Sequence, residues 1–276
     1  MKTTASTEVE WVTITPDKVI VANTENVWLH SPLDNEGQFA EPMIGNANSA
    51  KTSKLLDGAV AAAKIATPFS SNKFLTPNRL VWQLGGAYHI AHATPTLMKK
   101  AGQRFAIALR HGLGNWAFEK AKKETGHDRL VLLDIKSLGY RAEELVKAII
   151  PSASTTLIDY FQRSVSDVDP IDCVGYVHAL ERMSLGARKE HIHKIDDLLP
   201  LNVDATRCLR VDHSLGVNTK HLEENVDMIA RLAPSERTRV IRACYETALL
   251  LFNYPREGYL SETELEYLLK PFKLTM

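Results

Sequence analysis

The chain has 276 residues, and its 33 Lys and Arg residues are balanced by 33 Asp and Glu residues. A neutral chain lacks the basic surface that nucleic-acid-binding proteins use, so we expect no nucleic-acid partner. The longest apolar runs, such as 248–252, are too short to cross a bilayer, and the first residues hold no apolar signal segment. Three widely spaced cysteines fit neither a disulfide framework nor a zinc site. We therefore expect a cytoplasmic protein without a membrane partner.

The first 50 residues have β character. Residues 9–15 and 18–22 flank a Pro-Asp turn pair, which predicts an antiparallel hairpin, and 27–30 is a candidate third strand. Three short strands bury little apolar surface by themselves. We predict that residues 1–50 form a β-rich appendage or lid on a helical bundle of residues 51–276. A mobile tail with weak β character is the alternative.

Beyond the β-rich segment, apolar residues recur at helical spacing, and capping signals separate one helix from the next. The Thr-Pro pair at 94–95 predicts that the helix opened by Pro77 ends or kinks just after His92. Gly216 is the one interruption expected in a long helix over 204–232. The other helices are expected at 54–66, 97–109, 115–127, 129–138, 142–150, 155–163, 170–183, 239–252 and 265–269. The predicted fold class is therefore an all-α bundle with short connections.

Glu124 and His127 form the first candidate for chemistry. They are three residues apart, so on a helix both side chains lie on one face. A carboxylate and an imidazole at this spacing form the Glu-x-x-His element of non-haem di-iron sites. A solvated glutamate beside a partly buried histidine is the alternative for so short a motif. Further candidates come as pairs on three other predicted helices: His89 and His92, His178 and Glu181, and His213 and His221.

In order and spacing, these positions resemble the haem-oxygenase-like di-iron oxidases, an iron-containing redox enzyme family. The resemblance covers about 80–252 and rests on the Glu-Thr-Gly-His run at 124–127, on Glu181 within Gly-Tyr-x-x-x-x-Glu, and on the helix of His213 and His221. It implies a haem-oxygenase-like seven-helix bundle that binds two Fe(II) ions and uses O2 on a small organic substrate. The implied substrate is an amino acid or a metabolite derived from one, in a biosynthetic pathway. The implied reaction is desaturation, oxidative C–C or C–N cleavage, or N-oxygenation.

The chain departs from the family pattern on the last metal helix. The family reads His-x-x-x-Asp-x-x-His, whereas this chain has one extra residue between His213 and His221. It also has Asn218 where the family has Asp, so that position offers a carbonyl oxygen without charge. A π-bulge around Gly216 would absorb the extra residue, and we predict one there.

A second departure lies on the first metal helix, where the family commonly has Glu. This chain offers His89 or His92 instead, and both stay open. Since two carboxylates balance two ferrous ions poorly, one iron is expected to be held weakly. The metal ligands implied by the resemblance are Glu124, His127, Glu181, His213, His221, Asn218 and either His92 or His89.

Two side chains are candidates for binding the substrate. Arg210 lies about one turn before His213 and has the fork geometry that binds a carboxylate, although such arginines usually face solvent. His178 either supports a metal ligand or packs in the core, or it binds the substrate. The alternatives to an oxidase are a metal-free enzyme like thiaminase II, with Cys173 or Cys208 as the nucleophile, and a non-catalytic helical binding protein. Homodimerisation is left open.

Overall fold

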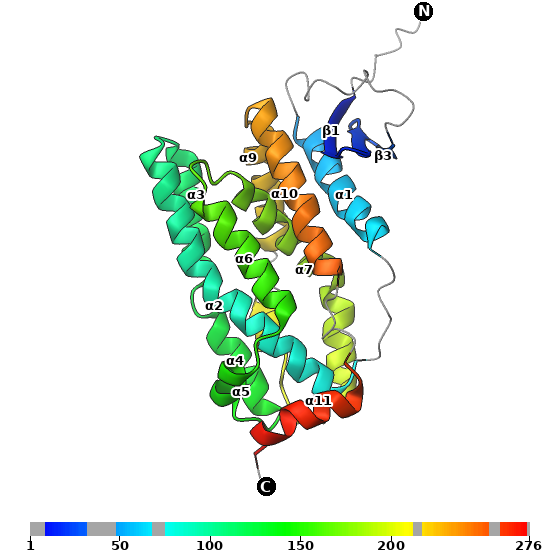
Figure 1. Cartoon of the computed structure of the whole chain (residues 1–276), viewed down its shortest axis with the longest axis vertical. Coiled ribbons are helices and arrows are strands. Elements are labelled where there is room, and N and C mark those ends of the chain that lie inside the picture. The colour runs from blue at the N-terminus through cyan, green and yellow to red at the C-terminus, as the bar shows by residue number, and fades with distance from the viewer. Residues whose placement is uncertain (1–8, 32–47, 68–74, 212–216, 254–259, 275–276) are drawn as a thin grey trace, which may run out of the picture. The chain divides into compact units, whose positions relative to one another are not determined.

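The computed structural model describes residues 9–31, 48–67, 75–211, 217–253 and 260–274 (Figure 1). These residues are helical apart from one three-stranded sheet near the N-terminus and short connections, so the predicted all-α class with a small β element is confirmed. The chain forms two compact units. The first unit comprises Met1–Pro68, Ile171–Arg182 and Thr219–Phe252. The second unit comprises Phe69–Pro170, Met183–Asn218 and Asn253–Met276.

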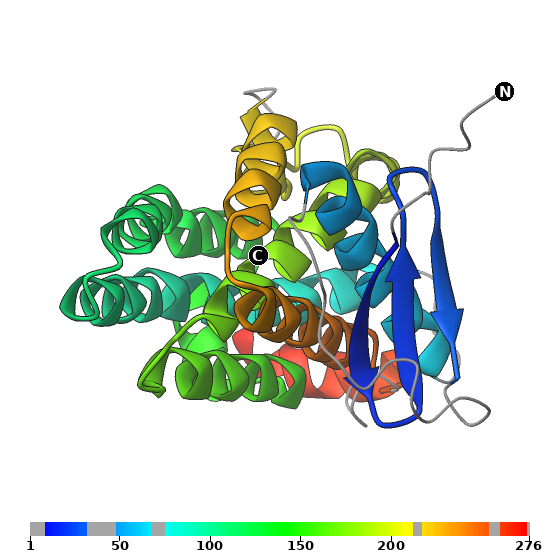
Figure 2. The ribbon, with the colours of Figure 1, turned by 90° about the horizontal axis from the view of Figure 1, so that it is seen from above.

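The first unit opens with an antiparallel sheet of strand order β1-β2-β3, which Figure 2 shows in dark blue. Val12 and Ile14 of β1 are buried, because alternate residues of a strand point to the same face. The predicted hairpin and the candidate third strand are both confirmed. The elements are β1 (Glu10–Thr15), β2 (Lys18–Ala22), β3 (Val27–His30), α1 (Ser49–Ala66), α10 (Pro234–Phe252), the start of α7 (Asp172–Leu198) and most of α9 (Val217–Ala230).

Close packing and a buried ion pair join the sheet to α1. A Cβ at Gly58 would lie 2.6 Å from a methyl of Val27 and 2.7 Å from a methyl of Ile20, so glycine allows α1 to approach the strands. The ammonium of Lys51 lies 3.8 Å from a carboxylate oxygen of Glu10, and both side chains are buried. The strands therefore contribute to the packed interior of the first unit.

Helices α7 and α10 touch at the backbone of Gly175. A Cβ at this position would lie 2.1 Å from the carbonyl oxygen of Val240 and 2.8 Å from the Cβ of Ala243. One turn earlier, Arg239 Nε donates a hydrogen bond to Asp172 Oδ1 at 3.0 Å. The missing side chain at position 175 therefore sets how closely the two helices approach.

We expect Gly175→Ala to lower the free energy of unfolding by about 1–3 kcal/mol, because the added methyl forces α7 and α10 apart. Gly112→Ala is the matched control, since Gly112 is also helical but nothing lies within 4 Å of a Cβ there. The control should leave stability unchanged or slightly higher. Urea unfolding at pH 7 measures both, and a Gly175→Ala protein as stable as wild type would contradict the close contact.

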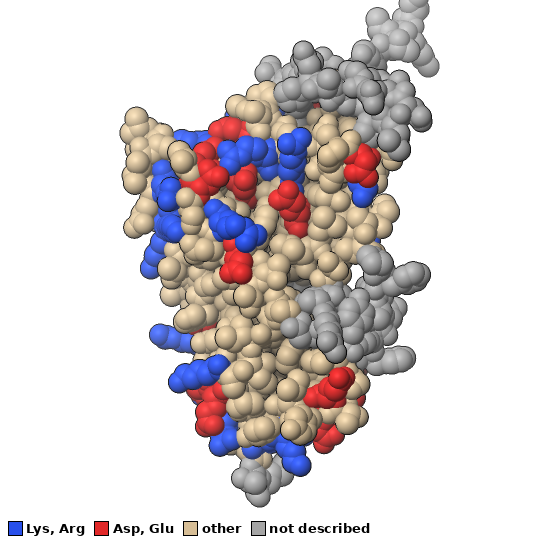
Figure 3. Space-filling view, viewed as in Figure 1, with Lys and Arg blue, Asp and Glu red and all other residues tan. Residues whose placement is uncertain are grey.

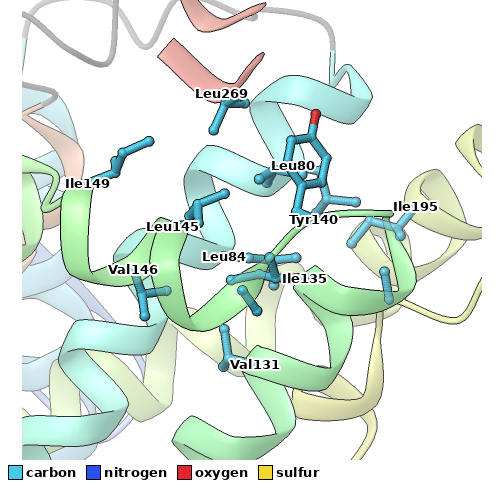
Figure 4. Close-up of a cluster of buried hydrophobic side chains, with 13 residues drawn as sticks. Leu80, Leu84, Val131, Ile135, Tyr140, Leu145, Val146, Ile149, Ile195 and Leu269 are labelled. Atoms are coloured by element: carbon cyan, nitrogen blue, oxygen red, sulfur yellow. The ribbon is translucent and has the colours of Figure 1, made fainter. Parts of the chain in front are cut away.

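The second unit is built around a core of apolar side chains from α2, α4 and α5, with Tyr140 and Leu269 packed against them (Figure 4). Ser261 caps the last α-helix of this unit with a capping box, in which its hydroxyl accepts from the Glu264 amide and the Glu264 carboxylate accepts from the Ser261 amide. The elements are α2 (Pro77–Ile107), α3 (His111–Glu124), α4 (His127–Ser137), α5 (Ala142–Ala148), α6 (Ser152–Ser166), the rest of α7, α8 (Arg207–Val211), α11 (Glu262–Leu269) and a 3-10 turn (Lys270–Phe272).

Helix α2 continues through Pro95, so the predicted helix end just after His92 is wrong, while the alternative of a kink stays a prediction. Proline removes one helical hydrogen bond and costs about 3 kcal/mol in a helix interior. Burial of Leu97 and Met98 on the following turn offsets that cost. The hydroxyl of Thr94 also donates to the carbonyl oxygen of Ile90, one turn earlier, at 2.8 Å.

One further boundary differs from the prediction, and a second falls partly outside the described residues. The helix expected at 115–127 is divided into α3 and α4, because Gly126 adopts a left-handed φ of 93° that ends the first helix. The helix expected over 204–232 is described as α8 and α9, with 212–216 between them. The predicted π-bulge around Gly216 lies outside the described residues.

The described surface agrees with the neutral composition. On the face shown in Figure 3, Lys and Arg side chains alternate with Asp and Glu side chains. Among the described helices, none is long and apolar enough to cross a lipid bilayer.

Candidate metal centre

Glu124 and His127 lie on either side of the break between α3 and α4. Glu124 is the last residue of α3, and His127 is the first residue of α4. The left-handed turn at Gly126 brings His127 Nδ1 to 2.9 Å from Glu124 Oε2. Lys120, one turn earlier on α3, places its ammonium 2.8 Å from Glu124 Oε1. The predicted pair is therefore brought together, across a turn and not along one helix face.

The Glu124 carboxylate stays ionised although it is mostly withdrawn from water. Burial opposes ionisation, but the hydrogen bond from His127 and the charge of Lys120 outweigh it and lower the pKa of Glu124 to about 2. An anionic oxygen beside an imidazole nitrogen is a donor pair that suits iron or manganese.

The chemistry of this pair therefore fits a divalent metal ion. Among the side chains that the structure describes, no group of three or more His, Cys, Asp or Glu residues is close enough to hold one. The other ligands implied by the family resemblance must be located individually.

The two candidates on the first metal helix have different surroundings. His92 Nδ1 lies 2.8 Å from Asp128 Oδ2, and its ring stacks on Tyr88 with 5.5 Å between centroids. The His92 side chain is 65% exposed. His89 is half-buried and donates from Nε2 to the carbonyl oxygen of Ile149 at 3.1 Å. Both histidines thus have one ring nitrogen engaged, and the choice between them stays a prediction.

Glu181 belongs to the first unit and is held by helix α9. Asn225 Nδ2 donates to Glu181 Oε2 at 2.7 Å. Asn225 follows His221 by four residues, which is about one turn of α9. His213 lies outside the described residues, and the side chains of Asn218 and His221 are not described. Their roles as ligands stay predictions.

His178 is buried within the first unit, with a 3% exposed fraction. Its Nδ1 has no hydrogen-bond partner among the described residues. Burial lowers the pKa of His178 to about 4. The charge of Asp57 raises this pKa slightly and the charge of Arg182 lowers it slightly, and these two side chains pair with each other at 2.7 Å. His178 is therefore neutral at pH 7, and its unpaired nitrogen keeps open the predicted role in binding substrate.

Arg210 is engaged within the second unit. Its guanidinium donates to both carboxylate oxygens of Asp196 at 2.9 Å and to the Thr206 hydroxyl at 2.7 Å. A substrate carboxylate would have to take the place of Asp196. The clamp role of Arg210 stays a prediction.

Sequence reasoning missed Asp134, a fully buried carboxylate in the second unit. It accepts from the backbone amides of Arg207 and Cys208 at 3.0 and 3.1 Å and from the Arg207 guanidinium at 3.2 Å. Burial raises the pKa of Asp134 in spite of these bonds. This carboxylate fixes the start of α8 onto α4. Its one sequence signal is a polar residue inside the apolar run 130–135.

The thiols in the first unit are poorly suited to nucleophilic chemistry. Cys173 and Cys244 are buried, and burial raises the pKa of Cys244 to about 12, which keeps that thiol protonated. Cys208, in the second unit, is half-buried.

No protein-family model and no curated protein matches the chain. Solved structures do. A domain of unknown function with a heme oxygenase-like fold, from Shewanella denitrificans, matches with a TM-score of 0.64 and 18% identity over 78% of this chain and 93% of that domain. The fold is haem-oxygenase-like. A TenA homologue from Pyrococcus furiosus shares this fold with a TM-score of 0.53 and 14% identity, over 73% of this chain and 97% of that one.

The buried, neutral His178 predicts a pH dependence of stability. Its folded-state pKa of about 4 lies below the ordinary value of 6.5, so the unfolded chain takes up a proton first as the pH falls. The free energy of unfolding is therefore not reduced by His178 above pH 6.5. It falls by about 3 kcal/mol between pH 7 and pH 4, as the unfolded chain takes up the proton.

His178→Gln removes this titrating group. We expect the free energy of unfolding of the variant to fall by about 3 kcal/mol less than that of wild type between pH 7 and pH 4. Urea unfolding at the two pH values measures the difference. Parallel losses in the two proteins would show that His178 titrates normally.

Proposed function

We propose that this protein is a non-haem iron oxidase that uses O2 on a small organic substrate. The supporting observation is the Glu124–His127 pair, in which an ionised, mostly buried carboxylate lies 2.9 Å from an imidazole nitrogen. The haem-oxygenase-like fold agrees with the family that the motif spacing resembles. Amino-acid side chains lack the redox chemistry to reduce O2, and in this proposal bound iron would supply it.

The proposal assigns two Fe(II) ions to the chain, one of them held weakly. When bound, iron would supply the electrons for the reduction of O2. Among the proposed ligands, Glu124 and Glu181 alone carry a negative charge. The second ion is therefore expected to bind less tightly. The proposed ligands are Glu124, His127, Glu181, His213, His221, Asn218 and either His92 or His89.

The residues around these ligands hold charge and protons in place. Lys120 contacts Oε1 of Glu124 and helps to keep the carboxylate ionised, while Oε2 contacts His127. His178 is neutral, so it can share a hydrogen bond with a substrate without adding charge to the interior. We propose an amino acid or a metabolite derived from one as the substrate, with Arg210 as the partner of its carboxylate.

The test is anaerobic calorimetric titration of Fe(II) into wild type, Glu124→Gln and His127→Gln. Wild type should bind one ion tightly and one weakly, and both variants should lose at least about 10-fold in the tighter affinity. Glu144→Gln is the matched control, because Glu144 is also helical but its side chain is 58% exposed beside Arg141. The control should bind like wild type.

Exposure of the iron-loaded protein to O2 should then produce a transient visible absorbance. Absence of iron uptake by wild type would overturn the proposal. Two equally tight sites would refute the weak second ion. If iron is not taken up and alkylation of Cys208 abolishes an activity, a metal-free enzyme like thiaminase II is favoured instead.

A further inference from the structure

The turn between α2 and α3 holds a leucine in a conformation that favours glycine. The amide of Leu109 donates to the carbonyl oxygen of Ala106 at 3.0 Å, and the amide of Arg110 donates to that of Phe105 at 2.8 Å. These are the two bonds of a Schellman motif, in which Leu109 takes the position usually held by glycine, with a left-handed φ of 59°. A side chain in this conformation costs free energy that glycine would not. Because Leu109 is 78% exposed, burial within the chain does not offset the cost, which indicates a role outside the folded interior.

Two more apolar side chains are exposed near Leu109. Ile107, the last residue of α2, is 82% exposed, and Val168, which follows α6, is 89% exposed. All three residues belong to the second unit. We call the side chains of Ile107, Leu109 and Val168 the apolar tip.

Two interactions hold the segment of Val168 against the turn. Arg104 Nη1 donates to the carbonyl oxygen of Asp167 at 2.9 Å. Arg110 Nη1 pairs with Asp169 Oδ1 at 3.1 Å. The residues on both sides of Val168 are therefore joined to the two ends of the turn, which places its side chain beside those of Ile107 and Leu109.

Basic side chains surround the apolar tip. Residues 99–118 contain four Lys and Arg residues and no Asp or Glu, and residues 163–170 contain one Arg and two Asp. Arg104 donates to a carbonyl oxygen and Lys100 to the hydroxyl of Ser166, both of them neutral acceptors. On the face shown in Figure 3, the free end of α2 and α3 is uncharged and has Lys and Arg side chains beside it. A chain with no net charge thus gathers positive charge at this end.

The extent of the apolar tip fits a lipid surface better than a second protein chain. A stable protein–protein interface buries about 800 Å² on each partner, from about 20 residues. Three side chains on two adjacent turns supply far less. Insertion of a few apolar side chains into a bilayer needs no matching surface, and neighbouring Lys and Arg side chains then attract anionic headgroups.

We propose that the apolar tip inserts Ile107, Leu109 and Val168 into the surface of a membrane that contains anionic lipids, with Lys100 and Arg104 against the headgroups. The protein then binds the membrane surface, and no helix crosses it. This inference differs from the expectation of no membrane partner, which rested on the absence of a spanning segment. It goes beyond the proposed function and does not depend on iron.

The test is co-sedimentation of the protein with vesicles made of phosphatidylcholine alone or of equal parts of phosphatidylcholine and phosphatidylglycerol. Wild type should bind the mixed vesicles at least about 10-fold more tightly than the neutral ones. Addition of about 0.5 M NaCl should weaken this binding, because salt screens the cations. Leu109→Gly should bind the mixed vesicles about 10-fold less tightly, because an apolar side chain is lost from the inserted surface.

Leu201→Gly is the matched control. Leu201 is a fully exposed leucine on the connection between α7 and α8. That connection leads to Ala205, which packs in the same core as Leu80, near the other end of α2. The same substitution at position 201 should therefore leave vesicle binding unchanged.

Stability without lipid separates a membrane role from a structural one. In urea unfolding, Leu109→Gly should be at least as stable as wild type, because glycine adopts a left-handed φ without strain. A less stable variant would show that Leu109 supports the fold, and it would overturn the inference even where vesicle binding falls.

Three binding results would also overturn the inference: no binding of wild type to the mixed vesicles, equal binding to both kinds of vesicle, or wild-type binding by Leu109→Gly. If wild type does not bind vesicles but forms a dimer that Leu109→Gly dissociates, the apolar tip is a contact between copies of the chain instead. None of these results bears on iron uptake, so the proposed function is tested separately.

Discussion

A carboxylate withdrawn from water must be matched by donors, and this constraint determines which side chains face each other in the chain. Glu124 is held between Lys120, one turn earlier on α3, and His127, which the turn at Gly126 brings within reach. In the same unit, buried Asp134 draws the backbone amides that start α8 onto α4. An unpaired buried carboxylate lowers the free energy of unfolding by several kcal/mol, which is a large part of the net stability of a small domain.

The same constraint gives the carboxylates different chemical characters. Lys120 and His127 keep Glu124 anionic far below neutral pH. Glu181 Oε2 accepts a hydrogen bond from the buried amide of Asn225, while the neighbouring Arg182 donates to Asp57. The donors around a carboxylate therefore affect its chemistry as well as folding.

Sequence reasoning recovered the features that depend on local pattern. The strands were readable from alternation around a turn pair, and the Glu124–His127 pair was readable from its spacing, since a carboxylate and an imidazole three residues apart meet in a helix and across a tight turn alike. The helix end predicted near Pro95 is wrong, because tertiary burial outweighs a local penalty. Asp134 and Asn225 were missed because their partners lie 73 and 44 residues away, and no spacing rule connects them.

The most direct test of iron binding by the motif residues is a crystal of the protein soaked anaerobically with Fe(II) and measured at the iron absorption edge. Anomalous difference density should appear within bonding distance of Glu124 and His127, and within bonding distance of Glu181. Two results would contradict the assignment of this chain as an iron enzyme. One is density that appears only at surface histidines, and the other is Glu124 still hydrogen-bonded to His127 with no iron beside it.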